Sequence, residues 1–401
     1  ERTNTATAIH IFANYLTGEN NNLQSNLQLD LIRLMVNHNL DLSVINTNGI
    51  SSIHNICSDR NKLTSSDQLI AIQLLIDRGY DLNAVNQNQN QMRPIHYVTS
   101  KRNHLSSKDQ VKVIEKMINS GRIDFNAQDK SGQKPIHYVT SKMNHMLSND
   151  QIYAIMLICP KTKDMKTLDS NGNAPIHNVT SCFNNLNSRN QCDAIKYLVT
   201  SDIDLNVSDG TGNTPLHNIL GKNNNMWTNH VLEILTMFCN EKNRIIDFES
   251  MDSNGWRPVH FVISNQNNFS KSDQDKALKL LLKQKVDINA ITFSGHRPIH
   301  LIAFFENNGS LKKNNQNLKK YNQIRFLKML IHREADIEAK IIALKKNFVS
   351  PSEGQTILQL LRSQSLSPPR YEYERSELCQ YAISIITAHM NSIIRKKEEM
   401  E

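Results

Sequence analysis

Short hydrophobic segments that repeat with the period of a helix alternate with polar stretches along the chain. In one such segment, Val111, Ile114, Met117 and Ile118 fall on one face of a helix. A shorter segment begins at Pro94, and proline is favoured at the first position of a helix, where its missing N–H leaves nothing unpaired. The pattern predicts pairs of helices, a short one followed by a longer one.

The same pair of segments returns along almost the whole sequence. Its centre is Pro-Ile-His or a close variant, with the histidine at positions 96, 137, 177, 217, 260 and 300, and with Ala8-Ile9-His10 and Ser52-Ile53-His54 as looser copies. These histidines are 44, 42, 41, 40, 40, 43 and 40 residues apart. A fixed period of this size predicts a stack of supersecondary units, each unable to bury its apolar face alone.

Two polar features mark the start of each unit. An Asp-apolar-Asn step, such as Asp124-Phe125-Asn126, lies 13 residues before the histidine in six of eight copies. A turn containing glycine follows, which supplies positive φ at a hairpin tip without steric cost. The turns are Asn48-Gly49, Ser131-Gly132, Asn171-Gly172, Thr211-Gly212, Asn254-Gly255 and Ser294-Gly295.

A repeated Ser-x-x-Gln pattern stands between the two helices of a unit. It has the form of a capping box, in which serine caps the second helix and glutamine reaches back to the helix start. We therefore expect Ser107→Ala to cost about 1 kcal/mol. The five copies begin at Ser25, Ser65, Ser107, Ser148 and Ser188.

Charge and cysteine content narrow the function classes. The formal net charge of +8 is thinly spread, with its densest patch at Lys312-Lys313 and Lys319-Lys320, whereas nucleic-acid binders gather such charge on one face. Nucleic-acid binding is therefore not expected. Six cysteines without metal or framework spacing suit a reducing compartment, and we expect a cytoplasmic protein. The sequence contains no apolar run of 18 or more residues, so no membrane span is predicted.

The combination of hairpin, glycine turn, Pro-Ile/Leu-His and second helix resembles the ankyrin repeat. Thr214-Pro215-Leu216-His217 matches the central tetrapeptide of that family, and residues 74–83 follow its second-helix and exit pattern. The resemblance runs from Thr7 to about Leu361. It implies an all-α repeat solenoid of about nine helix-loop-helix plus hairpin units over residues 1–365. Ser367-Pro368-Pro369 then breaks the pattern, and we expect a capping helix, with Ile386 and Ile393 on its apolar face, and a charged tail over residues 366–401.

The units also depart from the family pattern. The family repeat has about 33 residues, whereas these units have 40 or more, and the excess lies in a long loop between the helices. Arginine or lysine stands before the proline at Arg93, Lys134, Arg257 and Arg297, where the family has threonine. The curvature of the stack is therefore left open.

Neither metal nor nucleophilic chemistry is expected from the periodic residues. Neighbouring units stack on the order of 10 Å apart, whereas zinc ligands lie about 2 Å from one ion. The resemblance implies instead that each histidine hydrogen-bonds to backbone in the turn. His54 and Cys57 are one helical turn apart, but the repeat gives both of them structural positions. We expect no catalytic, cofactor or metal site, and a monomer.

A partner surface is predicted from the recognition positions of the family, which are the hairpin tips and the end of the first helix. Trp256 lies at such a turn with no evident core to fill, and exposed aromatic residues are common binding anchors. The predicted partner-binding residues are Trp256, His296, Phe304, Phe305, Lys101, Lys142 and Lys222. The alternative is that Trp256 packs on a neighbouring hairpin and both Phe side chains fill space beside the loop at 307–317.

The C-terminal residues 395–401, Arg-Lys-Lys-Glu-Glu-Met-Glu, resemble the glutamate-rich signal of effectors that intracellular bacteria inject through type IV secretion. Together with the repeats, this favours a non-enzymatic scaffold that binds a protein of the host cytoplasm. Two alternatives stay open. The chain could be a specificity adaptor for an enzyme such as a ubiquitin ligase, or the binding part of a larger enzyme whose catalytic domain precedes residue 1.

Overall fold

The structure, a computed structural model, describes residues 2–87, 90–201, 203–240, 245–264, 266–302, 316–340, 355–365 and 373–398. It divides into two compact units. Unit 1 consists of Glu1–Gly210 and Asn224–Met226, and unit 2 consists of Thr211–Asn223 and Trp227–Glu401. The boundary between two domains that we predicted at residues 365 and 366 stays a prediction.

The described residues form nine pairs of helices, each with a first and a second helix. In unit 1 the pairs are α1 (Arg2–Thr17) and α2 (Ser25–Asn37), α3 (Ser52–Cys57) and α4 (Ser65–Asp77), α5 (Pro94–Thr99) and α6 (Ser107–Asn119), α7 (Pro135–Thr140) and α8 (Ser148–Ile158), and α9 (Pro175–Thr180) and α10 (Ser188–Val199). The 3₁₀ helix η1 (Cys159–Lys161) extends α8. In unit 2 they are α11 (Pro215–Leu220) and α12 (Thr228–Asn240), α13 (Pro258–Ile263) and α14 (Lys271–Leu282), α15 (Pro298–Leu301) and α16 (Gln316–His332), and α17 (Ile357–Ser365) and α18 (Tyr373–Glu398).

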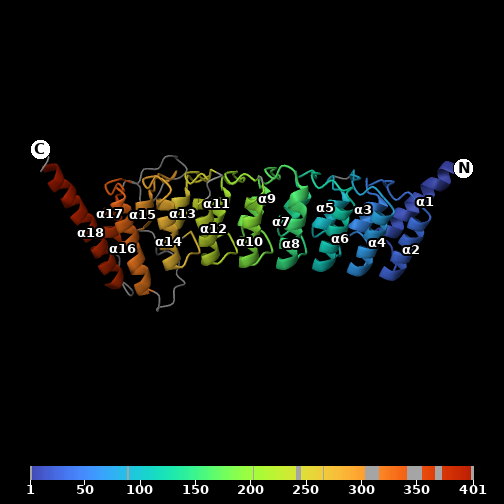
Figure 1. The fold of residues 1–401 in the computed structure, drawn as a ribbon, viewed down its shortest axis with the longest axis horizontal. Helices are drawn as coiled ribbons and strands as arrows, with labels where there is room; N and C mark the ends of the chain where they lie inside the picture. The colour runs from blue at the N-terminus through green and yellow to red at the C-terminus, as the bar shows by residue number, and fades with distance from the viewer. Residues whose placement is uncertain are drawn as a thin grey trace. The chain divides into compact units, whose positions relative to one another are not determined.

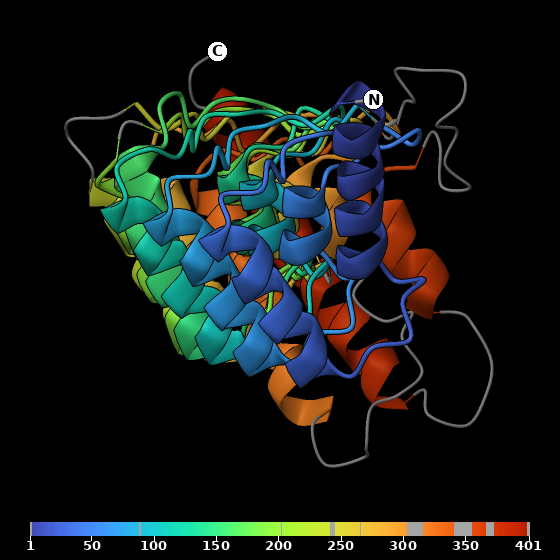
Figure 2. The ribbon, with the colours of Figure 1, turned by 90° about the vertical axis from the view of Figure 1, so that its right-hand side faces the viewer.

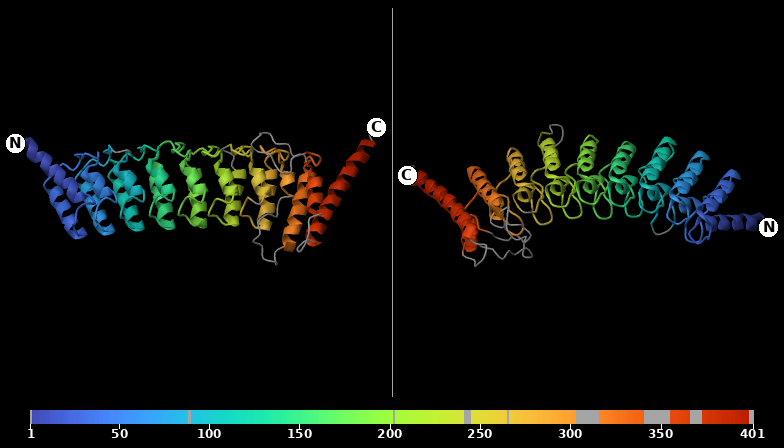
Figure 3. Two further views of the ribbon diagram at one scale, coloured as in Figure 1. Left: turned by 180° about the vertical axis from the view of Figure 1, so that it is seen from behind. Right: turned by 90° about the horizontal axis from the view of Figure 1, so that it is seen from below.

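Helices of the same kind pack side by side within each unit. In unit 1 the first helices α1, α3, α5, α7 and α9 contact one another in succession, and the second helices α2, α4, α6, α8 and α10 do the same (Figures 1 and 2). Unit 2 repeats this arrangement with α11, α13 and α15 in one row and α12, α14 and α16 in the other (Figure 3). Each unit is thus a stack of helix pairs, and the predicted all-α ankyrin-like repeat architecture is confirmed.

The repeated histidine ties a first helix to the hairpin of the next pair. His96 Nδ1 accepts the N–H of Arg93 at 3.0 Å, and His96 Nε2 donates to the carbonyl of Ala127 at 3.0 Å. An Nδ1 that accepts requires a neutral ring, and burial lowers the pKa of His96. The same two contacts recur at His54, His137, His177, His260 and His300. The structural role that the resemblance implied is confirmed.

The first pair lies in a different register from the one predicted. Thr17 Oγ1 donates to the carbonyl four residues earlier, as the threonine three residues after the histidine does in α5, α7 and α9. Asn14, not His10, therefore stands in the histidine position, 40 residues before His54. Asn14 Nδ2 makes the expected inter-pair bond, to the carbonyl of Val44 at 3.1 Å. The assignment of Ala8-Ile9-His10 as a copy was wrong because in the first pair an asparagine, and not a histidine, makes the inter-pair hydrogen bond.

A buried glutamine closes the loop between the two helices of a pair. Gln151 Nε2 donates to the carbonyls of Val139 and Ser141 at 2.9 and 2.8 Å, while its Oε1 accepts the N–H of Asn185 in the next pair at 2.9 Å. The glutamine does not reach back to the start of its own helix, so the capping-box prediction is wrong in this respect. Equivalent donors are Gln28, Gln68, Gln110, Gln191 and Gln274.

The serine of the predicted capping box joins adjacent pairs. Ser65 Oγ accepts the N–H of Ser106 at 2.7 Å and donates to the carboxylate of Asp109 at 2.6 Å. The cap of α6 is Ser106, whose Oγ accepts the N–H of Asp109 at 3.3 Å. Ser107 instead contacts Leu147 N–H and the Asp150 carboxylate of the following pair. The pattern located the helix start to within one residue but assigned the wrong partners.

Glycine is required at the hairpin tips for conformation and for space. Gly172 has φ of +78°, and a Cβ there would lie 2.6 Å from the backbone nitrogen of Gly210 in the next hairpin. Neighbouring hairpins are also joined by backbone hydrogen bonds, such as Ser170 N–H to the carbonyl of Ser131 at 2.8 Å. The tips therefore form a continuous edge within each unit.

The last helix of the chain packs as the second helix of the ninth pair. α18 contacts both α17 and α16, and it buries Cys379, Ala382 and Ile386. Ile393, which we expected on the same apolar face, is 40% exposed.

Candidate functional site

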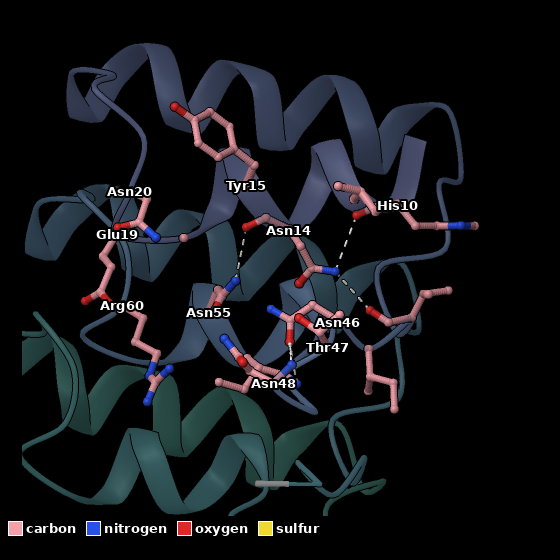
Figure 4. Close-up of a pocket in the computed structure, with 15 residues that line it drawn as sticks. His10, Asn14, Tyr15, Glu19, Asn20, Asn46, Thr47, Asn48, Asn55 and Arg60 are labelled. Atoms are coloured by element: carbon pink, nitrogen blue, oxygen red, sulfur yellow. Dashed lines mark hydrogen bonds between the residues drawn. The ribbon is translucent and has the colours of Figure 1, made fainter. Parts of the chain in front are cut away.

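Among the described residues, a hollow lies against the hairpin tips in each unit. The hollow in unit 1 has a volume of about 540 Å³ and is bounded by α1, the hairpin at 44–48 and Arg60 (Figure 4). Asn14, Asn46, Asn48 and Asn55 line it with carboxamides.

The side chain of Asn14, which lines this first hollow, has hydrogen-bond partners at its nitrogen but not at its oxygen. Its Nδ2 donates to the carbonyls of His10 and Val44, but its Oδ1 is buried without a hydrogen-bond partner. In later pairs the histidine Nδ1 receives the N–H of the residue before the proline; here α1 continues upstream, so that the corresponding N–H belongs to the helix. Because the orphan oxygen is itself covered by protein, it offers no acceptor to a ligand. No predicted partner-binding residue lines this hollow.

The second hollow, which we call the Trp256 groove, lies wholly in unit 2 and has a volume of about 400 Å³. Its aromatic lining consists of Trp256 and Phe261, and its charged lining of Asp252 and Lys222. The other lining residues are Asn213, His217, Asn218, Gly221, Asn223, Asn254 and Gln266. They come from the ends of two first helices, α11 and α13, and from the hairpins that precede them.

Trp256 is half-buried and fixed in place at both its backbone and its ring. Its carbonyl accepts the N–H of Asp252 at 2.9 Å and Nε2 of His217 at 3.1 Å. Its ring meets Phe261 edge-on at a centroid distance of 5.3 Å and lies 6.0 Å from the ring of His260. The indole thus rests on α13, the helix that follows its own hairpin, and also lines the groove, while the alternative in which it packs on a neighbouring hairpin stays a prediction.

The structure brings two of the predicted partner-binding residues together and separates the others. Trp256 and the exposed Lys222 line the same groove. His296 is half-buried in the next hairpin, where its Nδ1 contacts Ser294 Oγ at 2.8 Å and burial lowers its pKa to about 4. Lys101 and Lys142 are exposed in unit 1, and Phe304 and Phe305 lie outside the described residues.

Phe261, Asp252 and Gly221 were not identified as site residues. A signal for them was present in the aligned repeats. The position after the histidine is tyrosine at 97 and 138 but phenylalanine at 261, and glycine at 221 replaces the serine found at 100, 141, 181 and 264. Both changes remove a hydroxyl from residues that line the groove.

Candidate chemistry outside the groove finds no support in the described part of the chain. No group of three or more potential metal-ligating side chains converges there. Cys57 is fully buried and its burial raises the thiol pKa, so the reactive thiolate is disfavoured. Across the described residues, no helix has the length and apolar character needed to cross a membrane.

Comparison with known proteins gives structural likeness only. No family model matches the chain, and no curated protein matches its sequence. The chain is similar to the crystal structure of the ankyrin repeat domain of Bcl-3, described as a unique member of the IkappaB family, with 14% identity, coverage of 72% of this chain and 100% of that one, and a TM-score of 0.41. It is also similar to an ankyrin repeat domain from Acinetobacter baumannii AYE, with 17% identity, coverage of 62% and 97%, and a TM-score of 0.39.

Proposed function

We propose that this protein is a non-enzymatic scaffold that binds a protein partner, and that the Trp256 groove is the contact surface in unit 2. The observation that carries the proposal is the fixed, half-exposed indole of Trp256 at the wall of a groove. A rigid aromatic side chain loses little conformational entropy on binding, which is why such residues dominate interface hot spots. The surrounding carboxamides provide donors and acceptors for a peptide backbone.

The partner proposed is a protein of a host cell, and the chain itself a bacterial effector delivered by type IV secretion. The support is the charged C-terminal sequence, whose residues 399–401 lie outside the described part of the chain. A translocation assay tests this: a reporter enzyme fused to the chain should reach host cytoplasm, and deletion of residues 395–401 should abolish delivery. Delivery that is unaffected by the deletion would argue against the signal.

The groove is tested by photo-crosslinking from position 222, followed by affinity measurement with the partner that is captured. Trp256→Ala should weaken the complex by roughly 2 kcal/mol. Trp227→Ala is the matched control, because Trp227 is 73% exposed and does not line the groove. Since Trp256 also packs on Phe261, Trp256→Phe gives a milder variant whose folding is checked by its melting temperature.

Equal loss in the Trp256 and Trp227 variants would reject the groove as the contact surface. Recovery of ligase subunits by the crosslink would instead support the adaptor alternative.

A further inference from the structure

We infer that the Trp256 groove recognises an arginine side chain of the partner protein. This inference rests on the proposed function and deepens it. Its basis is the carboxylate of Asp252, which is only 9% exposed and lines the groove. Its Oδ1 accepts the N–H groups of Asn254 and Trp256, both at 2.8 Å. Among the described residues its Oδ2 has one distant contact, to Asn254 Nδ2 at 3.5 Å.

Two carboxylates in unit 1 hold the equivalent position: Asp169, 8% exposed, has Gln133 Nε2 at 3.4 Å from its Oδ2, whereas Asp129 is satisfied from within the chain. There Tyr138 Oη donates to Asp129 Oδ2 at 2.6 Å. Phe261 stands in the place of Tyr138 and has no hydroxyl to donate. The backbone contacts of Asp252 and Asp129 are otherwise the same, since both accept two hairpin N–H groups through Oδ1. Position 261 therefore supplies no hydroxyl to Asp252, whose carboxylate is mostly buried and, unlike those of Asp129 and Asp169, belongs to a residue that lines the Trp256 groove.

The chain supplies no cation for this carboxylate among its described residues. Asp252 takes part in no ion pair there, and Lys222, which lines the same groove, makes none either. Burying a carboxylate without a counter-charge costs free energy. A cation of the partner that pairs with Asp252 would therefore form a favourable charge-assisted hydrogen bond.

The shape and the remaining lining favour arginine over lysine. A guanidinium is planar, stacks on aromatic rings and donates several hydrogen bonds in a fixed plane, whereas an ammonium is compact and more strongly hydrated. The groove offers two aromatic side chains, Trp256 and Phe261, beside the carboxylate, and the side-chain carbonyl of the exposed Gln266 as a further acceptor.

The test uses the full chain with Trp227→Phe, so that Trp256 is the sole tryptophan. The probe is the blocked peptide acetyl-Gly-Gly-Arg-Gly-Gly-amide, titrated while the fluorescence of Trp256 is recorded. The matched peptide carries citrulline, which keeps the planar shape and loses the charge. We expect saturable binding of the arginine peptide, and roughly tenfold weaker binding of the citrulline peptide because a charge-assisted hydrogen bond is lost.

Two variants locate the binding. Asp252→Asn should weaken arginine binding roughly tenfold, and it should fold, because Asn46 and Asn86 hold the same hairpin position in other pairs and accept N–H groups through Oδ1. Phe261→Tyr should also weaken arginine binding, because the new hydroxyl would donate a hydrogen bond to the Asp252 carboxylate and compete with the arginine. Equal binding of both peptides, or arginine binding unchanged in Asp252→Asn, would overturn the inference.

The outcome separates this inference from the proposed function. A captured partner that loses affinity with Trp256→Ala but not with Asp252→Asn would leave the groove as a protein-binding surface and remove arginine as its ligand. Failure of Trp256→Ala to affect the partner would reject the proposed function itself, whatever the peptides do.

Discussion

Gln151 accepts the backbone N–H of Asn185 at 2.9 Å, and this bond joins two successive helix pairs of unit 1. The same side chain donates to two carbonyls at the end of α7, so one buried amide satisfies three backbone groups. Gln110 makes the two equivalent donor contacts, but its Oε1 has no hydrogen-bond partner. Gln151 and Gln110 therefore differ in the hydrogen bond to the next pair, which only Gln151 makes.

We predict that Gln151→Ala lowers the free energy of unfolding of unit 1 by about 3 kcal/mol, because buried polar backbone groups lose their partners. Gln110→Ala should cost about 1 kcal/mol less, since no inter-pair bond is lost. Urea denaturation followed by circular dichroism measures both variants. Equal costs would show that the contact to Asn185 adds nothing to stability.

The serine beside the helix start provides a second inter-pair contact, between Ser65 and Asp109. We predict a coupling energy of about 1 kcal/mol in a double-mutant cycle of Ser65→Ala and Asp109→Ala, because the two side chains share a hydrogen bond of 2.6 Å. The control is the combination of Ser65→Ala with Asp150→Ala, whose costs should be additive, since Asp150 lies one pair farther on. A coupling near zero in the first cycle would favour the capping role that the sequence pattern suggested.

The periodic pattern predicted the helix pairs, the hairpins and the role of the histidines, because all three depend on residue type at fixed spacing. It did not predict where a polar side chain finds its partner. Ser107 at the first helical position and Ser106 at the cap differ by one residue, and both are serine. Ser65 bonds Asp109, 44 residues farther on, and Gln151 bonds Asn185, 34 residues farther on. Both partners belong to the next pair, whereas a capping rule considers only the first turn of one helix.

The site was predicted in part from position and remains a prediction. Trp256 and Lys222 were selected as hairpin-tip and helix-end residues, and they line one groove. Phe261 and Asp252 were missed because the change from tyrosine to phenylalanine gains a meaning only beside the carboxylate that it leaves without a hydroxyl, as the pair Tyr138 and Asp129 shows. Such an absence becomes visible when the partner atoms are placed in space.

The buried histidines predict how stability depends on pH. Burial lowers the pKa of His260 to about 4, whereas an unfolded histidine titrates near 6.5. As pH falls below about 6.5 the unfolded chain binds a proton that the folded chain does not, so the free energy of unfolding decreases until about pH 4. The loss from His260 is about 3 kcal/mol between pH 7 and 4, and it is measured by urea denaturation at several pH values.

The control for this pH dependence is His260→Asn, the residue that the chain itself uses at position 14. Asparagine supplies a donor for the inter-pair carbonyl and does not titrate. The variant should be less stable at pH 7 and should show a shallower decrease toward pH 4. An unchanged slope would mean that other groups cause the loss.

The last prediction concerns the hydroxyl that distinguishes Tyr138 from Phe261. Tyr138→Phe should destabilise unit 1 by about 1.5 kcal/mol, because the charged carboxylate of Asp129 loses the hydrogen bond that Tyr138 Oη donates to its Oδ2. Phe261→Tyr should stabilise unit 2 by about 1 kcal/mol, since the new hydroxyl reaches an oxygen that has only a 3.5 Å contact. Urea denaturation measures both, with fluorescence of Trp256 reporting on unit 2. A stabilising Phe261→Tyr would show that the open carboxylate of Asp252 is retained at a cost to folding, as expected of a residue kept for binding. A destabilising Phe261→Tyr would mean that the hydroxyl does not reach Asp252 and that the phenylalanine does not account for the open carboxylate.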